Sequence, residues 1–457
     1  MLRDSLGAIV STDPLELDIA RSDRSGHVAV GTPLAFVRAR TVEDVQEVMR
    51  IASATGTPVV TRGAGTGLAG AAIASTGQIV LSTLAMDRVL EISADDELAR
   101  VEPGIINADL NDLLAPHGLW WAPDPASRAI STVGGNIATN AGGLLCAKYG
   151  VTRDAVLGLK VVLADGRLLD LGRRTVKGVT GLDLTALMIG SEGLLGVIVE
   201  ATLRLRRLDP HPVTTIGAWF GDVESAARAA AVITSSGVRP ALMELIDRPA
   251  MAAISAHLGL VGRGDVHLVV RTDGVAAAAE AEAVIGIVRS LGGEAEVSAT
   301  VEEGDRLLAI RRAFHPAMVA RGTVLIEDVC VPRSAMPAMF AAIEGISARS
   351  GIEIATVAHA GDGNLHPNFV FTPDANDPLG VPEAVWAAAD EMFLTALRLG
   401  GTLTGEHGVG ILKQRWLGQE LGEEQLDIQR GLKAVFDPDG LLNPSAVFPA
   451  PSQQLQG

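Results

Sequence analysis

The sequence predicts an α+β fold, and three observations lead to that prediction. The chain has 457 residues, which allows roughly two or three domains of about 150 residues each. Up to about residue 207, strand-like runs and glycine clusters alternate with short helices, and from there to about residue 405 amphipathic helices alternate with strand-like runs. We therefore expect one domain over residues 1–207, a second over residues 208–405 and a C-terminal segment over residues 406–457.

Composition and charge indicate a soluble cytoplasmic protein. Hydrophobic residues make up 48% of the chain, but no run of about 18 uncharged apolar residues suggests a transmembrane segment. The N-terminus lacks the basic start and the cleavage site of an export signal. Only two cysteines, Cys146 and Cys330, are present, which is typical of a reducing compartment. The net charge of −17 disfavours nucleic acid and anionic lipid as partners.

The first clear element is a helix over residues 41–54. Thr41 and Asp44 have the spacing of a capping box, and Gly56 lies just past the expected end. An apolar stripe at helical spacing is formed by Val42, Val45, Val48, Met49 and Ala52. A short buried strand over residues 58–61 should follow.

The loop after that strand, RGAGTGLAGAA, matches the dinucleotide-binding fingerprint at Gly65, Gly67 and Gly70. In a Rossmann domain this loop must open a helix, whereas the residues that follow it are β-branched and interrupted by glycine. We therefore interpret the loop as a nest of backbone amides for phosphate oxygens. A flexible surface turn is the alternative reading.

Two further glycine clusters follow, over residues 131–143 (STVGGNIATNAGG) and residues 190–205 (GSEGLLGVIVEATLRL). A rigid turn, PDPAS at residues 123–127, precedes the first of them. Three glycine-rich loops at the ends of strand-like runs predict one large phosphate-bearing ligand that is wrapped by backbone.

The second domain is expected to contain helices and strands in alternation. Helices are predicted over residues 222–235, 276–290 and 335–349, and strands over residues 266–271, 322–331 and 352–371.

A candidate metal site combines HAGDGNLH, residues 359–366, with TGEHG further along the chain. If Asp362 and Gly363 form the two-residue turn of a hairpin, His359 and His366 lie directly opposite one another with Cβ atoms about 5 Å apart. Two imidazoles and the carboxylate of Glu406 suit Zn²⁺, with Mn²⁺ or Fe²⁺ as alternatives. Two surface histidines that flank a polar turn are the competing interpretation. His407, beside Glu406, is a candidate general base.

Several motifs occur in the order of a known family: RGAGTGLAG, PDPAS, TVGGNIATNAGG, GSEGLLGV, HAGDGNLH, GEHGVG and FDPDGLLNP. With them, residues 33–448 resemble the FAD-linked oxidoreductases of the vanillyl-alcohol oxidase type, in the branch of D-lactate, glycolate and D-2-hydroxyglutarate dehydrogenases. The resemblance implies a two-part FAD-binding domain and a cap domain with an antiparallel sheet and helices, and a C-terminal segment that returns to the flavin.

The resemblance also implies which residues bind the FAD. They are Arg62, Gly63, Ala64, Gly65, Thr66, Gly67, Pro123, Asp124, Ser127, Thr132, Gly135, Asn136, Thr139, Asn140, Gly142, Gly143, Tyr149, Glu192, Gly193, Gly196, Val197, Ile198 and Asn443. Some relatives attach FAD covalently through a histidine in the first loop. Residues 61–72 contain no histidine, so we expect non-covalent FAD.

For the activity, the resemblance implies oxidation of a 2-hydroxy acid by hydride transfer to flavin N5. His407 is then the base, and Arg311, in LLAIRRAFHPA, is the arginine that binds the substrate carboxylate. Arg312 is the neighbouring alternative, and either residue can be a surface charge instead. The role implied for His407 has its own alternative, a histidine that only hydrogen-bonds the flavin.

The sequence departs from the D-2-hydroxyglutarate enzymes at two positions. Their lysine for the distal carboxylate falls on Ile326, and a substrate-binding threonine falls on His315. A monocarboxylate such as D-lactate or glycolate is therefore favoured over D-2-hydroxyglutarate, unless Arg321 or Lys413 reaches the substrate instead.

Two other activities compete with this interpretation. An alkyl-transfer ether-lipid synthase of the same family uses a tyrosine, and the only tyrosine here is Tyr149. A zinc hydrolase, or a metal-binding protein without redox activity, is the second competitor.

The electron acceptor does not follow from the sequence. No second dinucleotide fold, iron–sulfur cysteine set or haem motif occurs, so we expect a quinone, an electron-transfer protein or oxygen rather than NAD. The oligomeric state is equally open, a homodimer included.

Overall fold

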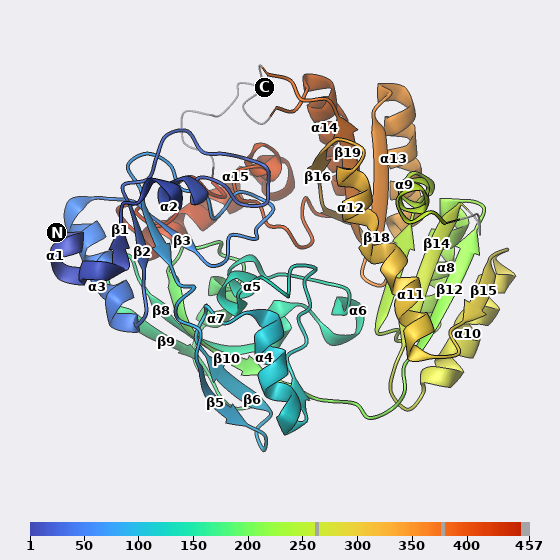
Figure 1. Ribbon diagram of the computed structural model, residues 1–457, viewed down its shortest axis with the longest axis horizontal. Coiled ribbons are helices and arrows are strands. Elements are labelled where there is room, and N and C mark those ends of the chain that lie inside the picture. The colour runs from blue at the N-terminus through green and yellow to red at the C-terminus, as the bar shows by residue number, and fades with distance from the viewer. Residues whose placement is uncertain (261–264, 376–379, 449–457) are drawn as a thin grey trace. The chain divides into compact units, whose positions relative to one another are not determined.

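The computed structural model describes residues 1–260, 265–375 and 380–448, and the chain divides into two compact units (Figure 1). Unit 1 comprises Met1–Gly142, Gly150–Leu208 and Glu406–Gly457, and unit 2 comprises Gly143–Tyr149 and Asp209–Gly405. The stretch Gly143–Tyr149, which the sequence places in the first domain, thus groups with unit 2. Within the described ranges, no helix has both the length and the apolar character that a membrane crossing requires.

Unit 1 contains two main sheets. The first has the order β1-β2-β4-β3, in which β2, β4 and β3 are parallel, and the second is antiparallel with the order β5-β6-β10-β8-β9. A two-stranded pair, β7 and β11, is separate from both. The strands are β1 (Val10–Ser11), β2 (Ala35–Arg38), β3 (Val59–Arg62), β4 (Ile79–Ser82), β5 (Val89–Ser93), β6 (Leu98–Val101), β7 (Leu119–Trp120), β8 (Val156–Val162), β9 (Leu168–Gly172), β10 (Val197–Arg204) and β11 (Arg206–Arg207).

The helices of unit 1 are short, with two exceptions. They are α1 (Leu2–Leu6), α2 (Pro14–Ile19), α3 (Val42–Thr55), α4 (Asn107–Leu114), α5 (Val133–Thr139), α7 (Leu184–Met188) and α15 (Gln414–Phe436), with 3₁₀ turns at Gly7–Ile9, Ala115–His117 and Thr152–Ala155. Helix α3 confirms the predicted helix, since Thr41 and Asp44 form the capping box and Gly56 takes the left-handed conformation after its end.

The loop after β3 leads to β4 without a helix, so the Rossmann reading is wrong and the nest remains a prediction. The second glycine cluster differs from the expectation of a loop. Residues 133–139 form α5, because the Thr132 hydroxyl accepts a hydrogen bond from the amide of Gly135 and Asn140 ends the helix with φ of 51°.

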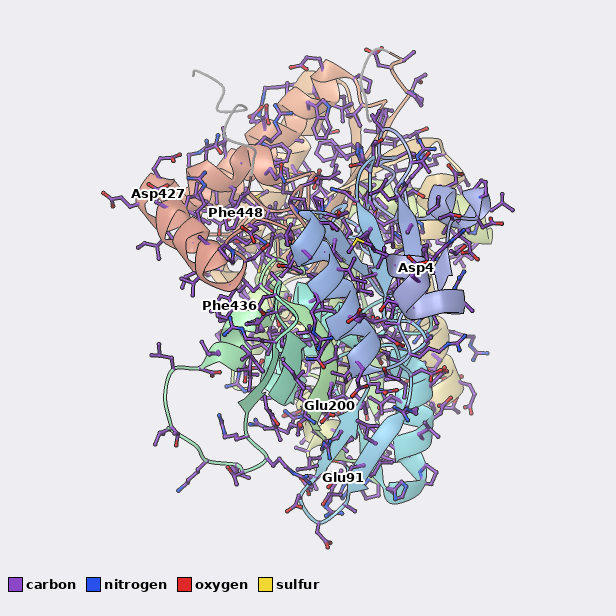
Figure 2. All side chains as sticks on the ribbon, turned by 90° about the vertical axis from the view of Figure 1, so that its left-hand side faces the viewer. Asp4, Glu91, Glu200, Asp427, Phe436 and Phe448 are labelled. Atoms are coloured by element: carbon purple, nitrogen blue, oxygen red, sulfur yellow. The ribbon has the colours of Figure 1, made fainter. Side chains whose placement is uncertain are left out.

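The C-terminal segment packs on the core of unit 1. Leu417 and Leu426 of α15 and Val447 belong to the same hydrophobic cluster as the second sheet, and Phe436 and Phe448, labelled in Figure 2, pack against it. The backbone amide of Asn443 also donates to the carbonyl of Val59, which adds the segment to the edge of β3.

Unit 2 is built on one antiparallel sheet with the strand order β15-β12-β14-β13-β18-β19-β16, and β17 also pairs with β19. The strands are β12 (Thr214–Phe220), β13 (Leu242–Ile246), β14 (Val266–Thr272), β15 (Glu294–Val297), β16 (Thr323–Ile326), β17 (Val329–Cys330), β18 (Glu353–His359) and β19 (Asn364–Phe371). The strand predicted over residues 322–331 is thus broken into β16 and β17, and residues 352–371 form the hairpin β18–β19.

Helices pack against this sheet, as the sequence predicts for the second domain. They are α6 (Cys146–Tyr149), α8 (Val223–Ser235), α9 (Arg248–Leu258), α10 (Ala277–Ser290), α11 (Val301–Arg312), α12 (Phe314–Val319), α13 (Met336–Ser350) and α14 (Glu383–Arg398), with a 3₁₀ turn at Arg333–Ala335. One face of β13 carries Leu242, which packs with α11, and Ile246, which packs with α9 and α12.

The register of the hairpin corrects one prediction. His359 pairs with Asn364, and His366 pairs with Val357, so the two histidines are not directly opposite. The turn spans four residues rather than two, because the amide of Gly363 donates back to the carbonyl of His359 and Gly363 has φ of 95°. The shift is two residues, so both histidines still point to the same face of the sheet.

Candidate active site

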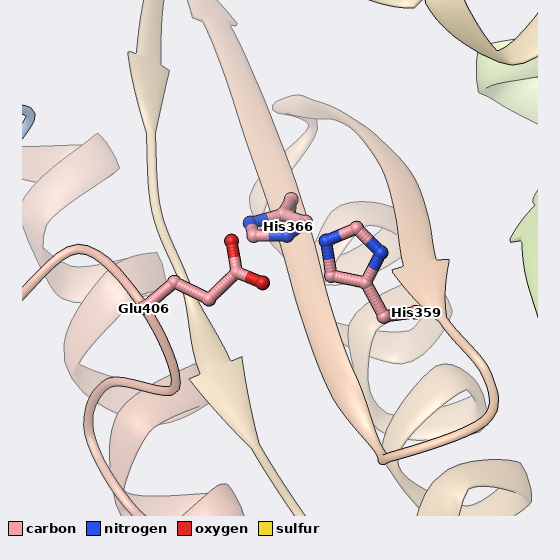
Figure 3. Close-up of side chains that lie close together, drawn as sticks. All are labelled: His359, His366 and Glu406. Atoms are coloured by element: carbon pink, nitrogen blue, oxygen red, sulfur yellow. The ribbon is translucent and has the colours of Figure 1, made fainter. Parts of the chain in front are cut away.

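His359 and His366 form the first part of the candidate site. Both are buried, and their ring centroids lie 4.9 Å apart in an edge-to-face arrangement. Together with Glu406 they offer three ligand atoms that lie within 4.8 Å of one another, and Figure 3 shows the three side chains converging. These are the three residues that the sequence pattern selects, although the hairpin brings the histidines together in a different register.

Glu406 is fixed by the two residues before it. The Asp328 carboxylate, which is buried, accepts hydrogen bonds of 2.7 Å from the hydroxyl of Thr404 and from the amide of Gly405. A Cβ atom on Gly405 would lie 2.6 Å from the side chain of Asn364, so only glycine allows this approach to the hairpin. One peptide bond therefore joins Glu406 to a segment that is anchored on unit 2.

Glu244 of β13 is the principal residue that the sequence analysis missed. Its side chain is fully buried; Oε1 lies 2.6 Å from Nδ1 of His359, and Oε2 accepts a hydrogen bond of 2.8 Å from Nε of Arg311. The predicted histidine ligand and the predicted substrate arginine thus share one carboxylate. A single acidic residue inside the apolar run LMELI was the available signal, because a buried charge needs partners.

A divalent cation fits the group formed by His359, His366 and Glu406. Two imidazoles and a carboxylate are a donor set that Zn²⁺ takes in catalytic sites. Asn364 lies opposite His359 and is buried, and neither polar atom of its amide has a partner among the described residues. Unsatisfied amide atoms are costly in the interior, so a polar occupant beside the histidines would lower that cost.

In unit 1, the first glycine loop is shaped by Arg62. This residue is buried at the end of β3, and its Nη1 donates to the carbonyl of Ala72 across the loop. Burial lowers the pKa of the guanidinium, and the charge of Asp23 opposes that shift. Gly65 has φ of 68°, and a Cβ there would lie 2.1 Å from the guanidinium. Arg62 therefore sets the path of Gly63, Ala64, Gly65, Thr66 and Gly67.

The three glycine segments converge within unit 1. A Cβ on Gly63 would lie 2.4 Å from the hydroxyl of Thr132, so the first and second segments touch. The amide of Glu192 donates to the carbonyl of Ala138, which joins the second and third segments. The side chain of Asn443 donates to the carbonyls of Ala71 and Glu192 and so ties the C-terminal segment to the first and third segments.

Several predicted flavin residues use their side chains within the protein. Asn136 accepts from Asn107 and donates to Ser131, and Thr139 donates to the carbonyl of Gly135. The carbonyl of Pro123 also accepts from Asn107, so Pro123, Asp124 and Ser127 lie in a turn linked to α5. The side chain of Asn140 accepts a hydrogen bond from the amide of Arg153. Val197 and Ile198 are each part of a hydrophobic cluster.

Some of the predicted glycines and Tyr149 are explained by local packing. A Cβ on Gly196 would lie 2.3 Å from Val161, and one on Gly142 would lie 2.6 Å from Oε1 of Glu406. Gly193 has φ of 78°. Gly143 and Tyr149 belong to unit 2, where the Tyr149 hydroxyl donates to Asp273.

Glu192 fixes the loop after the candidate base. Its two carboxylate oxygens accept hydrogen bonds of 2.8 Å each from the amides of Val409 and Gly410. Burial raises the pKa of this carboxyl to about 7, although the two amides and Lys413 act in the opposite direction. His407, three residues before Gly410, lies in the loop that this carboxylate holds.

Two family models match the chain. Residues 33–172 match the FAD binding domain, and residues 209–447 match the C-terminal domain of FAD linked oxidases.

Curated relatives match over most of their length. The glycolate oxidase subunit GlcD of Bacillus subtilis is 38% identical over 91% of this chain and 89% of its own. D-lactate dehydrogenase of Archaeoglobus fulgidus is 34% identical over 89% of each chain, and D-2-hydroxyglutarate dehydrogenase of Stutzerimonas stutzeri is 33% identical over 96% of each chain.

The fold is also that of a solved structure. p-Cresol methylhydroxylase with substrate bound superposes with a TM-score of 0.77 over 98% of this chain and 95% of its own, at 18% identity. This likeness confirms the predicted α+β fold with an FAD-binding domain and a cap domain. The two matched domains and the identity to full-length relatives together show that the chain is an oxidoreductase that belongs to the FAD-linked oxidases of the vanillyl-alcohol oxidase and p-cresol methylhydroxylase type.

Proposed function

We propose that the protein oxidises a D-2-hydroxy acid, such as D-lactate or glycolate, to the 2-oxo acid, with non-covalent FAD and a divalent cation, preferentially Zn²⁺. The convergence of His359, His366 and Glu406 within 4.8 Å is the observation that carries the proposal. The names of the three relatives add support, because glycolate, D-lactate and D-2-hydroxyglutarate share an α-hydroxy carboxylate.

When bound, the flavin supplies the hydride acceptor and the cation withdraws charge from the substrate hydroxyl oxygen. The residues of the chain do the rest. His407 takes the proton of the hydroxyl group, since histidine is the side chain that most often acts as a general base. Arg311 holds the substrate carboxylate with its two terminal nitrogens, since its Nε already donates to Glu244.

The side chains near Arg311 favour a monocarboxylate. Ile326 takes the place of the lysine that the D-2-hydroxyglutarate enzymes use, and the side chain at position 315 is an exposed histidine. Arg321, a substitute cation for a distal carboxylate, pairs at 2.7 Å with Glu353. D-2-hydroxyglutarate is therefore the alternative substrate rather than the preferred one.

The ether-lipid synthase alternative is disfavoured by the same structure. Its reaction needs a tyrosine as an acid, and the hydroxyl of Tyr149, the only tyrosine of the chain, donates a hydrogen bond to the carboxylate of Asp273.

A substrate screen tests the proposal. The purified protein is assayed anaerobically with an artificial dye acceptor and a panel of D- and L-2-hydroxy acids, including D-2-hydroxyglutarate, before and after treatment with a chelator. We expect turnover of D-lactate, glycolate or a related monocarboxylate, its loss on chelation and its return with Zn²⁺ or Mn²⁺. Undiminished activity after complete removal of metal would contradict the role of the three ligands.

The role of His407 is tested separately. We expect His407→Ala to retain the yellow flavin and to lose about 10²-fold or more of its turnover, because a positioned base contributes about 10²–10⁴-fold. His257→Ala, at an exposed position on α9, is the control and should behave like the wild type. A fully active His407→Ala protein would dismiss His407 as the base.

A further inference from the structure

The carboxylate of Glu244 makes two charged contacts inside unit 2. Its Oε1 is 2.6 Å from Nδ1 of His359, and its Oε2 is 2.8 Å from Nε of Arg311. The side chain of Glu244 has an exposed fraction of 0%, that of His359 7% and that of Arg311 16%. Both oxygens of one buried carboxylate are thus used to hold two side chains from different elements, β18 and α11.

The surroundings of Glu244 are apolar along its own strand. Leu242 and Ile246 flank it on the same face of β13, and each belongs to a hydrophobic cluster. A carboxylate at such a position is expensive to bury unless its charge is paired. An apolar residue would continue the packing, so packing alone gives no reason for a glutamate at this position.

The contact with His359 selects one ring nitrogen. When Nδ1–H donates to the carboxylate, Nε2 is the ring nitrogen that can ligate a cation, and the ring orientation is fixed. Carboxylates placed behind ligating histidines also raise the basicity of the imidazole. Glu244 therefore prepares His359 for ligation without touching the cation itself.

The contact with Arg311 selects one edge of the guanidinium. Because Nε donates to Glu244, the edge of the guanidinium that can bind a substrate is the one formed by its two terminal nitrogens. No other residue that the structure describes forms a hydrogen bond or an ion pair with these two nitrogens. That edge presents two N–H groups in the geometry that binds a carboxylate through both oxygens.

We propose that Glu244 is a positioning residue that holds the ligand His359 and the carboxylate-binding Arg311 in one fixed arrangement. The bound cation and the substrate carboxylate then keep a fixed position relative to each other. This inference rests on the proposed function. The inference goes further than the proposed function in one respect. The carboxylate of Glu244 touches neither the cation nor the substrate, and its loss should weaken the binding of both.

The test compares Glu244→Gln with Glu353→Gln. Glutamine has the shape of glutamate but cannot accept from His359 and Arg311 at once, whereas Glu353 lies on neighbouring β18 and pairs with Arg321. Zinc affinity is measured without substrate, by competition with a chromogenic chelator, on flavin-loaded protein. We expect Glu244→Gln to weaken zinc binding about 10–100-fold and to raise the KM for the best acid of the screen, and Glu353→Gln to change neither.

The outcomes separate this inference from the proposed function. A wild-type protein that binds no zinc and oxidises no acid overturns the proposed function itself. A wild-type protein that binds zinc and oxidises an acid, with a Glu244→Gln variant of unchanged zinc affinity and KM, overturns only the role of Glu244. If Glu244→Gln does not fold, Glu244→Asp replaces it. Aspartate keeps the charge but is one methylene too short for both contacts, so zinc affinity should still fall.

Discussion

Unit 1 and unit 2 each bury a glutamate, and the two carboxylates bind different kinds of partner. Glu192 in unit 1 accepts from two backbone amides, those of Val409 and Gly410. Glu244 in unit 2 binds two side chains, those of His359 and Arg311. The first carboxylate therefore fixes the path of the chain, and the second fixes functional groups.

The glycine segments of unit 1 show the same dependence on backbone rather than on side chains. The side chains of Arg62 and Thr132 lie so close to Gly65 and Gly63 that a Cβ atom on either glycine would overlap with them. The shape of this region therefore depends on the backbone. In unit 2 the chemistry depends on imidazole, guanidinium and carboxylate groups. We expect substitutions in the glycine segments of unit 1 to alter flavin binding through loop conformation, and substitutions of His359 or Arg311 in unit 2 to remove a functional group while flavin stays bound.

The largest effect should come from removing a histidine of unit 2. For His359→Ala we expect loss of zinc and a fall in turnover of about 10³-fold, because a bound cation contributes several kcal/mol to charge stabilisation. Flavin content, read from absorbance, should stay at the wild-type level. Zinc content by mass spectrometry and dye-linked turnover are the measurements. Loss of flavin together with zinc would contradict the expectation that flavin binding in unit 1 is independent of His359 in unit 2.

Arg311→Lys should have the next largest effect. Lysine offers one ammonium group, which cannot contact Glu244 and chelate a substrate carboxylate as the guanidinium does, so we expect KM to rise about 10–100-fold. Arg312→Lys, on the next and exposed residue of α11, is the matched control and should leave KM unchanged. Steady-state kinetics with the preferred acid decide the point. Equal effects of the two substitutions would contradict the assignment of Arg311.

A smaller effect is expected for Gly65→Ala in unit 1. The residue has φ of 68°, and the new methyl group would lie 2.1 Å from the Arg62 guanidinium. Strain of this kind costs about 1–3 kcal/mol, so flavin affinity should fall about 10-fold or more. Gly431→Ala, on α15 of the same unit, is the control, since no heavy atom lies within 4 Å of the added methyl group. Titration of apoprotein with FAD measures both variants, and identical affinities would show that backbone shape is not decisive there.

The last effect concerns stability and pH rather than activity. Burial raises the pKa of Glu192 from 4.5 to about 7, so the folded protein holds this proton more tightly than the unfolded chain does. The group therefore lowers the free energy of unfolding as pH rises from 4.5 to about 7. The full change for such a shift is about 3 kcal/mol.

Urea unfolding of apoprotein at about pH 5 and about pH 8 measures this contribution. Glu192→Gln removes the titrating group, so its stability should fall less than that of the wild type between the two pH values. Glu43→Gln, at an exposed position of α3, should keep the wild-type dependence. Identical dependence in wild type and Glu192→Gln would show that Glu192 carries no such proton.

Local signals predicted those parts of the fold that depend on neighbours in sequence. Helix α3 was predictable because Thr41, Asp44 and Gly56 specify its two ends within one short segment. The common face of His359 and His366 was predictable as well, because side chains alternate along strands. Their register was not, since the turn depends on how Gly363 closes back onto His359, and both turn lengths put the histidines on one face.

Contacts between distant segments were beyond the sequence. Glu244 lies 115 positions from His359, and only the pairing of β13 with β18 brings them together. The same limit applies to Asp328, which anchors Gly405 across 77 positions. The motifs therefore supplied the ligands, and the sheet topology supplied the residues that orient them.

The turn of the β18–β19 hairpin also bears on how this protein tolerates natural length variation. Sliding one strand past the other by a single position would send His366 through the sheet to the opposite side, whereas sliding by two would return it to the side of His359. An insertion or deletion in this turn that shifts the register of the two strands therefore keeps both histidines on one face only if the shift is an even number of residues. A related protein with a different hairpin register should differ by two residues rather than by one.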